Sequence, residues 1–244
     1  SVVLNEGGTY SVSGTSSYGC MSTAQVTVTK HALPIPVITG NSSICEGETG
    51  TLTASGGVTY FWSNGVSTAT MNPTAAGTYS VTVIDQHGCS DSLSTVISVR
   101  PTPQVSIVGD SAFCQGSTLI LTAHSVNQVT YSWSNGSTGS SISLNTPGIY
   151  SVTATDLNGC IATVSKNITQ KSIPAVQISG NLSPCLGSST TLSAVNAIQY
   201  LWSNGSTSNS ITVTPSTSTQ YSLTATGSNG CVKSTSVVVN PLPL

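Results

Sequence analysis

Seven cysteines are the residues of this sequence with the clearest chemistry. They fall into two series that repeat every 69 or 71 residues, one of Cys45, Cys114 and Cys185 and one of Cys20, Cys89, Cys160 and Cys231. No C-x-x-C pair and no histidine at ligand spacing accompanies them, so a metal centre is not expected. Isolated cysteines at a regular period favour disulfide bonds in an exported protein.

The sequence offers little support for a catalytic site. The three histidines, His31, His87 and His124, occupy unrelated positions and no partner recurs beside them. No G-x-S-x-G segment marks a nucleophile. Asp85 and Asp156 share one repeat position, but a calcium ion needs several oxygen ligands. We therefore expect no enzyme activity, no catalytic residue, no metal and no cofactor.

Composition narrows the class of protein further. Charged residues make up 5% of the chain and the formal net charge is −2. Such a chain has no basic face for the phosphates of nucleic acid or for an anionic membrane. No run of 18 apolar residues is present, so this segment is not expected to insert into a bilayer. The abundant Thr, Val, Ser and Gly favour strands and turns over helices.

Aromatic residues show the same period as the cysteines. Trp62, Trp133 and Trp202 are 71 and 69 residues apart, and Tyr10, Tyr79, Tyr150 and Tyr221 are 69, 71 and 71 apart. Spacings that differ by two keep each side chain of a strand on its original face, because strands have a period of two. We expect these tryptophans, together with Tyr79, Tyr150 and Tyr221, to lie in the core of a sandwich.

Turn residues separate the expected strands. Asn-Gly follows Trp-Ser three times, at Asn64, Asn135 and Asn204, which predicts a type I′ hairpin turn. A second turn ends in Gly-Cys, and the residue before its glycine, such as His87, is expected to tolerate a left-handed backbone. Short alternating strands at this spacing predict an all-β chain of tandem immunoglobulin-like antiparallel sandwiches.

Proline-containing joints divide the sequence. They predict the C-terminal half of a repeat at 1–33 and whole repeats at 34–102, 103–173 and 174–244. The half repeat lacks the strands before Tyr10 and should not bury a core alone. If strands enter and leave at opposite poles, each repeat adds ~35–40 Å to an extended rod.

The segments at 131–136 and 147–160, with Trp-Ser-Asn-Gly, a Pro-Gly-Ile-Tyr-Ser-Val-Thr strand and then Gly-Cys, resemble PKD-type immunoglobulin-like domains. The acidic turn of that family is shortened here to Ser-Asn-Gly. Tandem copies carrying Cys-x-Gly and Gly-Cys are similar to the large secreted surface adhesins of Bacteroidetes, in particular gliding-motility adhesins of the SprB type. That resemblance implies O-glycosylation of Asp-Ser-apolar patterns, which Ser92 and Ser111 match.

The spacing of the cysteines leaves two ways to pair them. Pairing within repeats joins Cys45–Cys89, Cys114–Cys160 and Cys185–Cys231 and leaves Cys20 unpaired; pairing across joints joins Cys20–Cys45, Cys89–Cys114 and Cys160–Cys185. A final strand of about 10 residues would carry each Gly-Cys turn ~33 Å from the joint, too far for a disulfide across it. We therefore expect pairing within each repeat.

Together these features predict an extracellular, cell-surface stalk or spacer. The expected partners are neighbouring repeats of the same chain and surface polysaccharide or a solid substrate. Two alternatives remain open: accessory repeats of a secreted hydrolase, and a segment of a self-assembling surface filament or layer.

Overall fold

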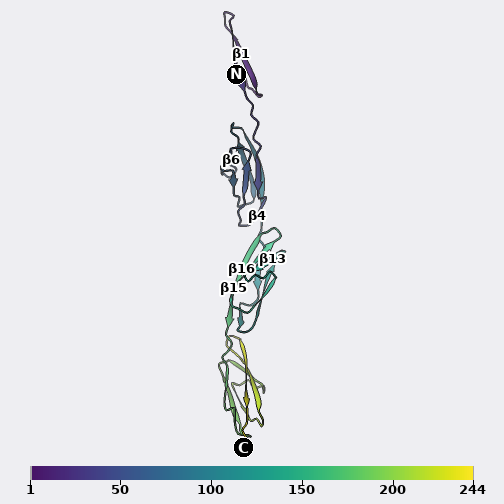
Figure 1. The fold of residues 1–244 in the computed structure, drawn as a ribbon, viewed down its shortest axis with the longest axis vertical. Helices are drawn as coiled ribbons and strands as arrows, with labels where there is room; N and C mark the ends of the chain where they lie inside the picture. The colour runs from purple at the N-terminus through teal and green to yellow at the C-terminus, as the bar shows by residue number, and fades with distance from the viewer. Residues whose placement is uncertain (1, 244) are drawn as a thin grey trace. The chain divides into compact units, whose positions relative to one another are not determined.

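The computed structural model describes residues 2–243, and every regular element in that range is a β-strand. It divides between Thr102 and Pro103 into two compact units, which are described in turn (Figure 1). Residues 2–243 hold no helix of the length and hydropathy that a membrane span requires.

The first unit holds a hairpin and one sandwich. The hairpin joins β1 (Gly8–Thr15) to β2 (Met21–Val28). One sheet of the sandwich has the order β3-β5-β7 and the other β4-β9-β8-β6. These strands are β3 (Val37–Gly40), β4 (Ser43–Cys45), β5 (Leu52–Ser55), β6 (Thr59–Trp62), β7 (Thr70–Met71), β8 (Gly77–Ile84) and β9 (Ser90–Arg100).

The second unit holds two further sandwiches. The first of them pairs a β10-β12-β14 sheet with a β11-β16-β15-β13 sheet, and the second pairs β17-β18-β20 with β19-β21-β22. The former has β10 (Val105–Val108), β11 (Ala112–Cys114), β12 (Leu119–Ser125), β13 (Val129–Trp133), β14 (Ser141–Leu144), β15 (Gly148–Asp156) and β16 (Ile161–Lys171). The latter has β17 (Gln177–Ser179), β18 (Thr190–Val195), β19 (Gln199–Trp202), β20 (Ser210–Val213), β21 (Thr219–Thr226) and β22 (Val232–Val239).

Alternation along each strand builds the cores. In β12, Leu119, Leu121 and Ala123 are buried while the residues between them face solvent. Such a period of two is what a sheet with one face on a core requires. The cluster that contains Leu121 also includes Phe113, Trp133, Ile142, Leu144, Val152 and Ile168. Equivalent clusters form around Trp62 and around Trp202, so each sandwich has a core of its own.

The N-terminal hairpin has no second sheet facing it among the described residues. Val12 follows Tyr10 by two, as Val81 follows Tyr79. Val12 is 69% exposed, whereas Val81 is fully buried. The same strand position is therefore core in a complete sandwich and surface in the hairpin.

The Asn-Gly turns differ from the expected type I′ geometry. In the first, the Gly65 N–H donates to the Trp62 carbonyl at 2.9 Å and the Trp62 N–H donates to the Val66 carbonyl at 2.8 Å. This pattern closes a three-residue loop in which only the glycine takes a positive φ, 88° at Gly65. Such a loop is a type I turn followed by a glycine bulge. The same two bonds recur at Trp133 and Trp202.

The Gly-Cys turns also place the left-handed residue differently. Positive φ falls on the glycine, 82° at Gly88, and not on His87 before it. The Asp85 N–H donates to the Cys89 carbonyl and the Gly88 N–H to the Asp85 carbonyl, which closes another three-residue loop. His87 is therefore free of the backbone demand expected from the sequence.

Candidate functional site

A short strand brings Cys114 to the end of its sandwich. β11 pairs in parallel with the last residues of β16, with Cys114 opposite Lys171. Cys160 immediately precedes β16, at the other end of the same strand. The 11 residues of β16 span ~36 Å at ~3.3 Å each, and a disulfide needs Cα atoms within roughly 7 Å. Cys114 and Cys160 therefore cannot join.

Cys114 is instead bonded to Cys231, with a Cα–Cα distance of 5.6 Å and a sequence separation of 117. The bond links two consecutive sandwiches, so the expected pairs Cys114–Cys160 and Cys185–Cys231 are wrong. The alternative Cys89–Cys114 is wrong as well, because Cys89 is free.

The other five cysteines are either disulfide-bonded or free. Cys45 and Cys160 are disulfide-bonded, whereas Cys20, Cys89 and Cys185 are free. The expected pair Cys45–Cys89 is therefore also wrong. Cys20 is unpaired in this chain, as expected, and Cys89 and Cys185 are unpaired as well.

The turn before β22 presents Cys231 to its partner. The Gly227 N–H donates to the Cys231 carbonyl at 2.8 Å and the Gly230 N–H donates to the Gly227 carbonyl at 3.0 Å. The Asn229 Oδ1 accepts the Cys231 N–H at 3.0 Å. Cys231 is fully buried. Two hydrogen bonds thus hold the Cys231 backbone in the turn, independently of the disulfide.

Two asparagine side chains of the last sandwich also hold the joint that follows β16. The Asn229 Nδ2 donates to the Ser172 carbonyl at 2.8 Å, and the Asn196 Nδ2 donates to the Ala175 carbonyl at 3.2 Å. Asn196 takes a φ of 67°, which asparagine tolerates better than most residues. We call the Cys114–Cys231 disulfide, Asn196 and Asn229 together the joint clamp. The sequence pattern marked the position of Asn229 only for its backbone conformation, and it did not mark Asn196.

Gly227 fits the same joint. The equivalent positions in two other turns hold Asp85 and Asp156. A Cβ on Gly227 would lie 3.4 Å from the Pro174 Cβ and 3.2 Å from the Asn229 Oδ1. A larger residue at position 227 would crowd Pro174 and Asn229. In this turn the Asn229 side chain accepts the hydrogen bond of the cysteine N–H, which Asp85 accepts in its own turn.

In the first unit, Asp85 caps its turn by accepting backbone hydrogen bonds from His87 at 2.8 Å and Cys89 at 2.9 Å. The His87 ring stacks on His31, with ring centroids 3.8 Å apart. Two histidines that seemed unrelated in sequence are therefore in contact. Partial burial raises the pKa of Asp85, but the two backbone N–H groups and the nearby histidines outweigh it and lower that pKa below 3.8.

This lowered pKa predicts a pH dependence. A carboxyl whose folded pKa is depressed contributes stability above its unfolded pKa and loses it as pH falls through the folded value. Asp85→Asn should therefore melt at a lower temperature than the native chain at pH 6, and the difference should shrink as the pH falls through the lowered pKa of Asp85. Melting from pH 2 to 7 measures it, with exposed Asp91→Asn as the control. A difference that stays constant over this range would contradict the assignment.

The tryptophans and tyrosines have structural contacts. Each tryptophan is at most 3% exposed and donates its Nε1–H to a carbonyl six residues later, namely Trp62 to Thr68, Trp133 to Gly139 and Trp202 to Ser208. Tyr79 and Tyr150 are partly buried and donate their hydroxyls to carbonyls four residues earlier, at Ala75 and Thr146. Tyr221 packs against the third core. These bonds resemble the tyrosine corner of sandwiches.

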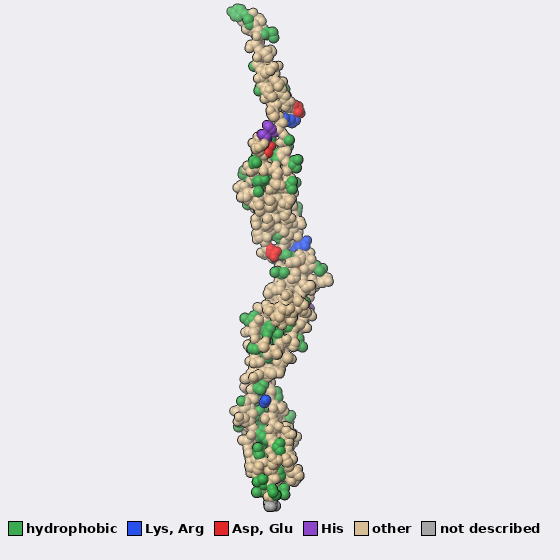
Figure 2. Space-filling view, viewed as in Figure 1, with side chains coloured by type: hydrophobic (Ala, Val, Ile, Leu, Met, Phe, Trp, Pro, Cys, Tyr) green, Lys and Arg blue, Asp and Glu red, His purple; other side chains and the backbone are tan. Residues whose placement is uncertain are grey.

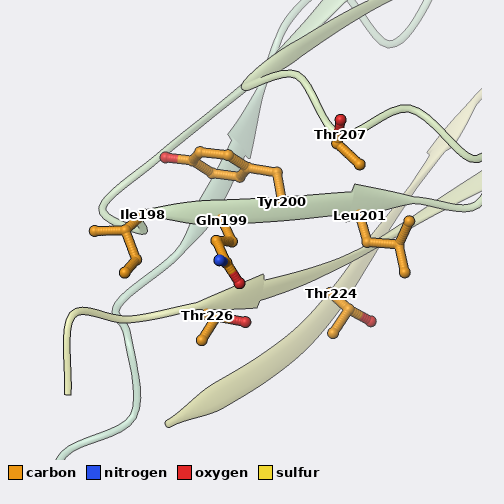
Figure 3. A pocket seen from close by; sticks show the side chains of 7 residues that line it. All are labelled: Ile198, Gln199, Tyr200, Leu201, Thr207, Thr224 and Thr226. Atoms are coloured by element: carbon orange, nitrogen blue, oxygen red, sulfur yellow. The ribbon is translucent and has the colours of Figure 1, made fainter. Parts of the chain in front are cut away.

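The exposed surface is mostly uncharged. Charged side chains are sparse in the space-filling view (Figure 2). A shallow groove on β19 and β21 is lined by Ile198, Gln199, Tyr200, Leu201, Thr207, Thr224 and Thr226 (Figure 3). The Tyr200 hydroxyl is already bonded to the Ala197 carbonyl at 2.9 Å. The two expected glycosylation serines, Ser92 on β9 and Ser111 before β11, are both exposed.

Comparison with known proteins identifies no family. No family model and no curated protein matches the sequence. Similar solved structures include the I67–I69 fragment of titin, at 15% identity and a TM-score of 0.38 over 88% of this chain and all of that one. A bacterial ice-binding adhesin is 15% identical with a TM-score of 0.32, over 88% and 100%. Sidekick-1 immunoglobulin domains 1–5 are 13% identical with a TM-score of 0.29, over 100% and 68%.

Within residues 2–243, two sheets face each other across a separate core three times. Among the described strands, β4 pairs in parallel with β9 and β11 pairs in parallel with β16, and every other strand pair is antiparallel. The chain is a tandem array of immunoglobulin-like β-sandwich repeats.

Proposed function

We propose that the chain is a stalk or spacer segment of an extracellular surface adhesin. The observation that carries this proposal is the joint clamp. A covalent bond and two side-chain hydrogen bonds restrain the segment between consecutive sandwiches. A restrained joint limits the bending between consecutive repeats, and a stiff connection suits a spacer.

The disulfides support the location in this proposal. Such bonds persist in oxidising compartments and are rare in the cytosol. The low charge leaves no basic face for nucleic acid. The proposed partners are neighbouring repeats, with repeat boundaries at 1–33, 34–102, 103–173 and 174–244, and surface polysaccharide or a solid substrate.

The finer assignment rests on the sequence pattern. Tandem Cys-x-Gly and Gly-Cys repeats with Trp-Ser-Asn-Gly support PKD-type repeats of a Bacteroidetes gliding-motility adhesin of the SprB type. In that setting Ser92 and Ser111 would carry O-linked glycans, and both are exposed.

Small-angle scattering of the whole chain under non-reducing conditions tests the spacer role. If each repeat adds ~35 Å, three repeats give a maximum dimension on the order of 110 Å. A compact globule of this length would instead have a radius of gyration of ~18 Å. A measured radius of gyration near the ~18 Å of the globule would overturn the spacer proposal. Reduction should broaden the distance distribution, because it breaks the Cys114–Cys231 bond of the joint clamp and also the bonds of Cys45 and Cys160. The sandwiches should stay folded, since each has a core of its own.

A further inference from the structure

The first cysteine of each repeat stands in one backbone setting. In two repeats it lies in parallel register with the end of the final strand, at Cys45 opposite Arg100 and Cys114 opposite Lys171. In the third, Cys185 forms a parallel bridge with Leu242, just beyond the end of β22. In each case the next N–H donates to that residue's carbonyl at 2.8 Å, from Glu46, Gln115 and Leu186. The three cysteines therefore occupy equivalent positions at the end where the chain leaves the sandwich.

The state of these equivalent cysteines differs. Cys114 is bonded to Cys231, the turn cysteine of the following repeat, and Cys45 is also disulfide-bonded. Cys185 is free and exposed. The backbone that presents Cys114 to a following repeat thus presents Cys185 in the same way with no sulfur bound to it.

An apolar surface surrounds Cys185 and is a second observation. Leu182, Leu186 and Leu242 are 39%, 40% and 51% exposed. Backbone bonds hold them together, since the Leu242 N–H donates to the Pro184 carbonyl and the Asn240 N–H to the Leu182 carbonyl, both at 2.8 Å. The corresponding positions around Cys114 hold Ser111, Gln115 and Lys171. Exposed leucines around a thiol favour an apolar partner surface.

We propose that Cys185 is a covalent attachment site for one further copy of this repeat. The copy would supply the cysteine of its Gly-Cys turn, as Cys231 does for Cys114. Cys89, a free turn cysteine, is the reciprocal site for the first cysteine of a preceding copy. Each repeat would thus be bonded to its neighbours and never to itself. The inference rests on the proposed function as part of an array.

The bond forms by thiol–disulfide exchange with a low-molecular-weight disulfide. The Cys185 thiolate attacks one sulfur of that disulfide and releases one small thiol. The turn cysteine of the partner repeat then attacks the Cys185 sulfur of the mixed disulfide and releases the second small thiol. Two protein thiols are oxidised, and their two electrons reduce the small disulfide to two thiols.

The test extends the native chain after Leu244 by a second copy of residues 174–244 and oxidises it in a glutathione redox buffer. Peptide mapping without reduction should recover Cys185 joined to the turn cysteine of the added copy. Alkylation of Cys185 by iodoacetamide should fall at least tenfold relative to the unextended chain. The control is the extended chain with Cys185→Ser, in which the added turn cysteine should be alkylated while the added repeat still melts cooperatively.

The outcomes of this test distinguish a failure of the attachment site from a failure of the spacer function. Full alkylation of Cys185 in a folded extended chain with Cys114–Cys231 intact would overturn the attachment site and leave the spacer function standing. Recovery of Cys114–Cys160 in place of Cys114–Cys231 would overturn both. Bonding of Cys185 to Cys231 would also overturn the inference.

Discussion

Replacing Trp133 by alanine is expected to lower the free energy of unfolding of its own sandwich by about 3–5 kcal/mol. Trp133 is 2% exposed and lies in the core cluster of that sandwich. Truncation removes the ring from a close-packed interior and leaves the Gly139 carbonyl, which accepts its Nε1–H at 2.9 Å, without that donor. Chemical denaturation followed by circular dichroism measures the effect, and the fluorescence of Trp62 and Trp202 reports whether the other two sandwiches keep their stability.

Two control variants sharpen this result. Trp133→Phe keeps most of the buried ring and should lose less stability than the alanine variant. Phe61→Ala removes an aromatic that is 50% exposed and should cost less still. Wild-type stability for Trp133→Ala, together with loss of binding to a glycan array, would make Trp133 a ligand residue and contradict its role in the core.

The double variant Cys114→Ser, Cys231→Ser should lose about 4–5 kcal/mol of stability in the chain-entropy account of a link between residues 117 apart. The reason is that the native bond restrains the unfolded chain across two sandwiches. Non-reducing denaturation of residues 103–244 within the whole chain measures the loss. Limited proteolysis should also become faster at the joint near Ser172.

Cys185→Ser is the matched control, because Cys185 is free and exposed in this chain. It should change neither stability nor the rate of proteolysis. If the double variant behaves like this control, the Cys114–Cys231 bond does not restrain the joint, and the remaining contacts of Asn196 and Asn229 would have to do so.

The secondary structure was largely predictable because its signals are local. Alternation in the segment of β12 and the recurring Trp-Ser-Asn-Gly predict half-buried strands joined by hairpins, and the all-β fold is confirmed. The turn type was not predictable from Asn-Gly alone. Both a type I′ turn and a type I turn with a glycine bulge accept these residues, and the choice depends on how the flanking strands pair. The bond from the Trp62 N–H to the Val66 carbonyl decides it.

The joint contacts lay beyond the reach of the sequence. Asn229 bonds to Ser172 across 57 residues, and His31 stacks on His87. These contacts depend on where a turn of one repeat lies relative to the segment before it. No residue type or spacing encodes that placement, since hydrogen bonds to backbone carbonyls can be made by many polar side chains.

The sequence by itself determined the period, the strands, their buried faces and the two cysteine series, because each follows from local alternation and spacing. Only the tertiary structure decided which cysteines meet. The expected pairing within a repeat required Cys114 and Cys160 to lie at the same end of their sandwich. β11 instead pairs in parallel with the end of β16, which places Cys114 one strand length from Cys160 and within 5.6 Å, Cα to Cα, of Cys231. A three-residue strand carries too little pattern to reveal which neighbour it pairs with, and that neighbour determines the covalent link between repeats.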